Sequence, residues 1–129
     1  MSLNRRNKIK ILILEDNPIR IEAFRKLFKY QDVIISETVD NAKEWCKREI
    51  FNALWLDHDL NGRIWEDSQE ENSGYQFVKW LIENGLQKKS LNYIHSMNPI
   101  GANKMLNLLL DNGRDGIWIP YHLLKLGEK

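Results

Sequence analysis

Apolar residues along this chain form five short runs, and the segments between the runs have a different spacing. The runs are aliphatic and aromatic without strict alternation, which is typical of strands buried on both faces of a parallel sheet. The pattern therefore predicts five strands. The runs span residues 9–14, 33–36, 53–57, 91–96 and 116–120.

Between the runs, apolar residues recur three and four positions apart, which predicts helices. Two of these helices share a start signal, in which an asparagine caps the helix and a proline occupies its first turn. Gly85 is expected to end the third helix. Only 9 residues follow the fifth run, so a last helix would be truncated. The expected helix starts are Asn17–Pro18, Asp40, Ser73–Gly74 and Asn98–Pro99.

Strands that alternate with helices predict an α/β fold. We expect a three-layer sandwich, in which helices cover both faces of a five-stranded parallel sheet. The chain has 129 residues and no evident linker or repeat, so residues 1–129 should form a single domain. Residues 1–8 are basic and are expected to form a flexible N-terminus.

Composition limits the classes of function. The formal net charge is +1, so no strong overall field favours nucleic acid or a membrane surface. Cys46 is the only cysteine, which excludes an internal disulfide framework and a thiolate metal cluster. No apolar run approaches the roughly 20 residues of a membrane-spanning helix, and the N-terminus lacks the apolar stretch of a signal peptide. We therefore expect a cytoplasmic protein.

Acidic residues follow two of the predicted strands. Glu15 and Asp16 end the first strand, and Asp57 and Asp59 follow the third. In open parallel sheets, ligands bind outside the carboxyl ends of the strands. Carboxylates suit a hard cation there, and Mg²⁺ commonly combines one or two carboxylates with a substrate phosphate. These four residues therefore predict a divalent-metal site, with Mg²⁺ as the expected ion and Mn²⁺ as the alternative.

Two histidines are expected at the same edge of the sheet. His58 lies between the two aspartates, and His95 ends the fourth run. Imidazoles act as general acids and bases near neutral pH, so His95 and His58 are candidate catalytic residues together with Asp57. Ser96 and Asn98 precede a helix whose free backbone N–H groups would attract phosphate, which makes them candidate substrate-binding residues.

These motifs resemble the response-regulator receiver domain over nearly the whole chain. Glu15 and Asp16 match its acidic pair, Asp57 its phosphoacceptor aspartate, and Ser96 the hydroxyl residue after its fourth strand. The resemblance implies a sheet in the order 2-1-3-4-5. Ile119 stands where receivers carry the lysine that contacts the phosphoryl group, so phosphorelay switching is not expected.

The sequence is more similar to the cyclic-phosphate-processing receiver-like family, a divergent branch of the receiver fold. The matching segments are LEDNPIR after the first strand, DHDL after the third, Gly74 in SGYQF, and HSMNP after the fourth. The resemblance implies metal-dependent processing of cyclic phosphates, above all hydrolysis. The implied substrates are RNA ends or nucleotides that carry a 2′,3′-cyclic phosphate, with an RNA-repair enzyme as an expected partner.

A second interpretation stays open. An atypical receiver domain could act as a signalling or interaction module, with the strand-end face as its interface. The two rim histidines favour the enzyme, because a pure interaction module has no need for them there. Trp65, in the polar loop after the third strand, is a candidate for stacking on a ligand. The oligomeric state is not predicted.

Overall fold

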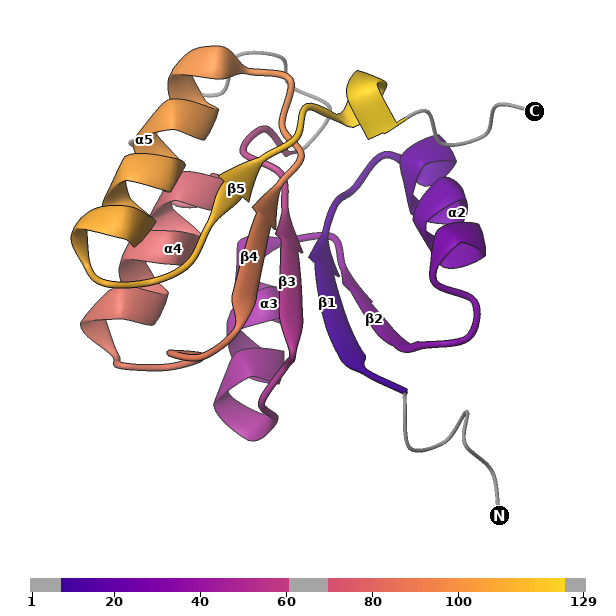
Figure 1. Ribbon diagram of the computed structural model, residues 1–129, viewed down its shortest axis with the longest axis horizontal. Helices are drawn as coiled ribbons and strands as arrows, with labels where there is room; N and C mark the ends of the chain where they lie inside the picture. Colours follow the sequence, from indigo (N-terminus) through magenta and orange to yellow (C-terminus); the bar gives the residue numbers. More distant parts are fainter. Residues whose placement is uncertain (1–7, 61–69, 125–129) are drawn as a thin grey trace.

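The computed structural model describes residues 8–60 and 70–124, and these form an α/β fold around one parallel sheet (Figure 1). All neighbouring strands pair in parallel, in the order β2-β1-β3-β4-β5, which confirms the expected topology. The strands are β1 (Lys10–Leu14), β2 (Asp32–Ser36), β3 (Ala53–Leu56), β4 (Leu91–Ile94) and β5 (Ile117–Trp118).

Four α-helices connect the strands and cover both faces of the sheet (Figure 1). Helix α2 and the terminal turn η1 pack on one face, and the other three helices pack on the opposite face. After β5 the described residues form one turn of 3-10 helix, and residues 125–129 lie outside the described part of the chain. The elements are α2 (Pro18–Leu27), α3 (Val39–Arg48), α4 (Gly74–Glu83), α5 (Pro99–Asp111) and η1 (Tyr121–Leu124).

Strand β1 lies between β2 and β3 and contributes side chains to both hydrophobic clusters. Its side chains alternate between the faces, so Leu12 and Leu14 join the larger cluster under α3, α4 and α5. Ile11 and Ile13 join the smaller cluster under α2, together with Phe24. Burial on both faces explains why the run has no polar alternation. No helix within the described ranges is both long and apolar enough to span a membrane.

The two asparagine–proline signals are confirmed as helix starts. Asn17 Oδ1 accepts hydrogen bonds from the backbone N–H groups of Ile19 and Arg20, at 2.9 and 3.1 Å. Asn98 Oδ1 accepts from the N–H of Gly101 at 3.1 Å. Both helices begin at the carboxyl edge of the sheet, so their first turns border the strand ends that carry the polar residues (Figure 1).

Two local expectations need correction. The cap of α3 is Thr38, whose Oγ1 accepts from Asn41 N at 3.1 Å, and Asp40 lies in the first turn. Strand β5 comprises only two residues, since Pro120 has no N–H to continue the ladder, although the N–H of Tyr121 still bonds to the carbonyl of His95.

Candidate functional site

Three ionisable side chains converge at the carboxyl ends of the central strands. Glu15, Asp57 and His95 each directly follow a strand, β1, β3 and β4. The parallel register places those ends side by side, since Leu14 pairs with Leu56 and Leu56 with Ile94. One ligand atom from each side chain lies within 4.8 Å of the others, and all three residues are buried. We call Glu15, Asp57 and His95 the strand-end cluster.

Glu15 is the most extensively bonded member of the cluster. Its Oε1 lies 3.0 Å from His95 Nε2, and its Oε2 accepts from the backbone N–H groups of Asp16 and Asn17, at 3.1 and 3.0 Å. Burial raises the pKa of Glu15, but the hydrogen bond with His95 and the backbone donors outweigh burial and hold the pKa below its ordinary value. Glu15 is therefore a fixed negative charge.

Asp57 is buried with less compensation. Its side chain accepts a hydrogen bond from the N–H of His58 at 2.8 Å, and the residue is only 4% exposed. Burial, aided by the nearby Glu15 carboxylate, raises the pKa of Asp57 to about 7, although His95 and Arg20 act in the opposite direction. The fold thus holds a carboxyl group whose negative charge an additional cation would stabilise.

Arg20 is a site residue that the sequence reasoning missed. Its Nη1 lies 3.8 Å from Glu15 Oε1 and 4.0 Å from Asp57 Oδ2. Arg20 is in the first turn of α2, where the helix dipole disfavours a cation unless acidic groups lie nearby. The sequence signal that could have identified Arg20 is therefore its unusual position for a cation, three residues after the Asn17 cap.

A second polar group of residues lies beside the strand-end cluster. Asp59 Oδ1 lies 2.8 Å from His58 Nδ1 and accepts a hydrogen bond from Asn98 Nδ2 at 3.1 Å. His58 is fully buried, and Asn98 is 5% exposed. The aspartate therefore ties the end of β3 to the first turn of α5. We call His58, Asp59 and Asn98 the His58 group.

Two glycines allow helices to approach the site closely. A Cβ atom at Gly74 would lie 2.0 Å from the carbonyl oxygen of Asp57, and one at Gly101 would lie 2.5 Å from His58 Cγ. Neither position has room for a side chain. Gly74 carries part of the family resemblance, whereas Gly101 was not singled out because helix spacing does not show which residue faces an imidazole.

The structure divides the predicted metal ligands between these two groups. Glu15 and Asp57 share the strand-end cluster, but Asp59 belongs to the His58 group. Asp16 is half-buried next to Glu15 and, in this conformation, is not among the three residues of the cluster. His95, a candidate catalytic residue, also lies in the strand-end cluster.

The predicted phosphate-binding residues already make local hydrogen bonds. Ser96 is buried, and its Oγ accepts from the N–H of Asn98 at 3.0 Å. The Asn98 side chain both caps α5 and donates to Asp59. Ile119, at the position where receivers carry a lysine, is half-buried. Within the described residues, the cation beside Asp57 is Arg20. Trp65 lies outside the described residues, so its expected role is untested.

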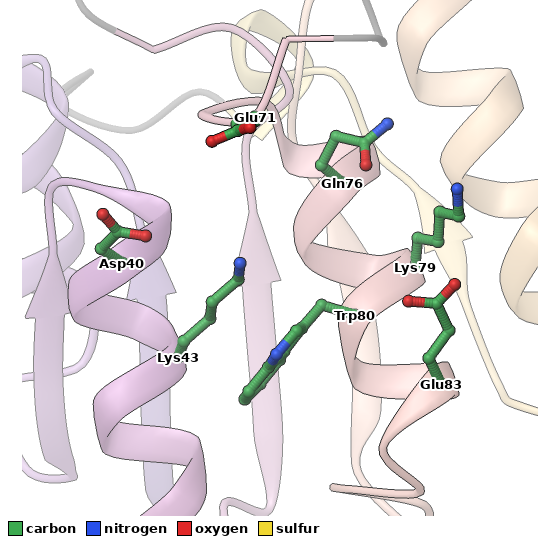
Figure 2. A pocket seen from close by; sticks show the side chains of 7 residues that line it. All are labelled: Asp40, Lys43, Glu71, Gln76, Lys79, Trp80 and Glu83. Carbon is green, nitrogen blue, oxygen red and sulfur yellow. The ribbon is translucent and has the colours of Figure 1, made fainter.

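A separate groove lies between α3 and α4 (Figure 2). It has a volume of about 170 Å³. Lys43 lies against the Trp80 indole, with Nζ 5.5 Å from the ring centroid. The lining mixes cations and anions and includes no histidine or cysteine, so this groove lacks the convergent ionisable groups of the strand-end cluster. The lining residues are Asp40, Lys43, Glu71, Gln76, Lys79, Trp80 and Glu83.

Comparison with solved structures confirms the fold. A CheY-like response regulator receiver domain from Methylobacillus flagellatus is 18% identical, with a TM-score of 0.64, and the match covers 92% of this chain and 93% of that one. The non-phosphorylated HemR receiver domain from Leptospira biflexa is 16% identical, with a TM-score of 0.66 and coverage of 88% and 82%. A CheY-like receiver domain protein from Methanospirillum hungatei JF-1 is 15% identical, with a TM-score of 0.63 and coverage of 88% and 81%.

Sequence comparison identifies a family within that fold. None of the curated proteins compared with the chain matches it. The model of the cyclic-phosphate processing receiver domain matches residues 10–111, which is most of the chain and includes the strand-end cluster and the His58 group. The chain belongs to the family of cyclic-phosphate processing receiver domains.

Proposed function

We propose that this protein hydrolyses cyclic phosphate esters with the aid of a divalent cation, Mg²⁺ or Mn²⁺. The substrates are nucleotides or RNA ends that carry a 2′,3′-cyclic phosphate. The observation that carries the proposal is the convergence of Glu15, Asp57 and His95 within 4.8 Å at the carboxyl edge of the sheet. Membership of a family named for cyclic-phosphate processing supports the substrate class.

The donor set fits a hard cation. Glu15 and Asp57 supply carboxylate oxygens from adjacent strand ends, and Asp16 is the next residue along the chain from Glu15. The raised pKa of Asp57 reflects a buried charge with incomplete compensation, and a bound cation would relieve it. A divalent ion held there would polarise a phosphoryl oxygen and orient water.

The hydrolysis itself has a simple balance. The oxygen of one water forms a bond to phosphorus, and one of the two ester P–O bonds of the ring breaks. One water proton ends on the freed hydroxyl oxygen, and the other stays on the new phosphate oxygen or passes to solvent. The product is a phosphate monoester. A group that moves these protons near neutral pH accelerates the reaction.

The two histidines have different surroundings for that task. Asp59 Oδ1 lies 2.8 Å from His58 Nδ1, and this contact favours the form of the imidazole that carries its proton on Nδ1. We therefore assign proton transfer to His58. His95 directs Nε2 at Glu15 and packs against Phe24, with ring centroids 4.9 Å apart. In this proposal His95 is a positioning residue that orients Glu15.

The test is turnover of 2′,3′-cyclic nucleotides and of RNA ending in a cyclic phosphate, with Mg²⁺ or Mn²⁺ present. Phosphorus NMR should show conversion of the cyclic ester to a monoester by the wild type. Chelation of the metal or Asp57→Asn should abolish the conversion, whereas Asp111→Asn, an exposed control on α5, should retain it.

A different result would favour the receiver module instead. If the wild type turns over no cyclic phosphate and a small phosphodonor phosphorylates Asp57 stably, the enzyme proposal is wrong. A cytoplasmic location and an RNA-repair enzyme as partner stay predictions of the proposal. Co-purification with RNA-processing proteins would test the second of these.

A further inference from the structure

We propose that Arg20 binds the phosphate group of the substrate, and that Tyr121 holds the Arg20 guanidinium in the orientation this requires. The inference rests on the proposed function, because it assigns a phosphate contact to the same site. It adds a substrate-binding residue from α2 and a positioning residue from η1 to the strand-end cluster.

The guanidinium of Arg20 has hydrogen-bond donors to spare. Its distances of 3.8 and 4.0 Å to the carboxylates of Glu15 and Asp57 exceed hydrogen-bonding range. Its Nη2 lies 3.3 Å from the sulfur of Met97, a weak acceptor. Among the described residues, no oxygen atom accepts a hydrogen bond from this guanidinium. A ligand with two oxygen acceptors would therefore meet unengaged N–H groups.

Tyr121 gives the guanidinium a fixed plane. Arg20 Cζ lies 4.6 Å from the centroid of the Tyr121 ring, which is the geometry of a cation–π contact. The ring packs edge-on against Phe24, at 5.8 Å between centroids, and the N–H of Tyr121 bonds to the carbonyl of His95 at 2.9 Å. The turn η1 is thus anchored to the site and supports Arg20.

Phosphate matches these features better than a carboxylate ligand does. The planar fork of arginine binds two oxygens of one phosphate at once, and a tetrahedral phosphate keeps another oxygen for a neighbouring cation. Arg20 lies next to the carboxylates that would hold the metal, so one phosphate can contact both. The side chain is 26% exposed, so a ligand can reach it from solvent.

The test uses inorganic phosphate as the probe, titrated by calorimetry into the protein with saturating Mg²⁺. Arg20→Gln should weaken phosphate binding by about 10- to 100-fold, the range for a charge-assisted hydrogen bond to a phosphate. Arg20→Lys keeps the charge but loses the fork, so its loss should be smaller. Arg25→Gln, an exposed arginine on the same helix, is the matched control and should bind as the wild type does.

Variants of Tyr121 separate positioning from general stability. Tyr121→Phe keeps the ring and should bind phosphate normally. Tyr121→Leu removes the cation–π contact and should weaken binding by about two- to five-fold. The unfolding temperature of each variant is measured as well. Tyr121→Leu should bind phosphate more weakly than Tyr121→Phe even when the two variants unfold at the same temperature.

The competing explanation is that Arg20 merely neutralises the carboxylates. In that case Arg20→Gln would tighten Mn²⁺ binding and leave phosphate binding unchanged, which would overturn the inference. Failure of the wild type to bind phosphate would overturn it as well. If phosphate binding depends on Arg20 but no cyclic ester is hydrolysed, the inference stands and the proposed function fails. If hydrolysis occurs and Arg20→Gln matches the wild type in phosphate affinity, the proposed function stands and this inference fails.

Discussion

Replacing Asp57 with asparagine should stabilise the metal-free protein at neutral and alkaline pH. Burial raises the pKa of Asp57 from its ordinary value of 3.8 to about 7. Each tenfold change in an ionisation constant corresponds to about 1.4 kcal/mol, so ionising Asp57 costs about 4 kcal/mol more in the folded protein than in the unfolded chain. Asparagine avoids this cost, and its side-chain oxygen can still accept the N–H of His58.

The pH dependence has a definite sign. The unfolded chain loses the Asp57 proton near 3.8 and the folded protein near 7. Between these values the folded protein binds more protons, so the contribution of Asp57 to the free energy of unfolding falls as the pH rises. The advantage of Asp57→Asn over the wild type should therefore grow across this window and become constant above it.

Urea denaturation of the chelator-treated protein over this pH range measures the effect. Asp111→Asn, which removes an exposed carboxylate from α5, controls for the general loss of one negative charge. Added Mg²⁺ should stabilise the wild type at neutral pH and have a much smaller effect on Asp57→Asn. A stability difference that does not change with pH would refute the reasoning that Asp57 is a buried, poorly compensated charge.

Substitutions at three further residues test the rest of the site. Gly101→Ala should lower the free energy of unfolding by about 1–3 kcal/mol, the usual cost of overpacking, because its Cβ would lie 2.5 Å from His58 Cγ. Wild-type stability of this variant in urea denaturation would contradict the close packing of Gly101 against His58. His95→Gln can still donate to Glu15 and should bind Mn²⁺ more tightly than His95→Ala, and equal affinities by calorimetry would remove the positioning role. Asp59→Asn should lower kcat with little change in KM if Asp59 sets the proton-transfer form of His58, whereas a rise in KM alone would place Asp59 in substrate binding.

The fold was predictable because its signals are local and repeated. The buried strands carry unbroken apolar runs, and Asn17–Pro18 and Asn98–Pro99 mark helix starts whatever surrounds them. The strand order came from the family motifs, since periodicity alone does not show which strands are neighbours. Local signals also failed in places: Thr38 and Asp40 are both good caps, and only the backbone path decides between them.

The site was predictable in its location but only partly in its pairings. The rule that ligands bind at the carboxyl ends of parallel strands correctly brought Glu15, Asp57 and His95 together. The hydrogen bond between His95 and Glu15 depends on side-chain directions that spacing does not show. Arg20 was missed because the sequence does not show that a cation in this first helical turn lies beside the carboxylates of Glu15 and Asp57.

A crystal structure with Mn²⁺ and a nucleoside 2′-phosphate or 3′-phosphate product tests the central claim most directly. The account predicts an anomalous Mn²⁺ peak between the carboxylates of Glu15 and Asp57, with the product phosphate bound both to that ion and to the Arg20 guanidinium. The account would be contradicted if Mn²⁺ and phosphate were bound away from the strand-end cluster and the same protein turned over no cyclic phosphate in solution.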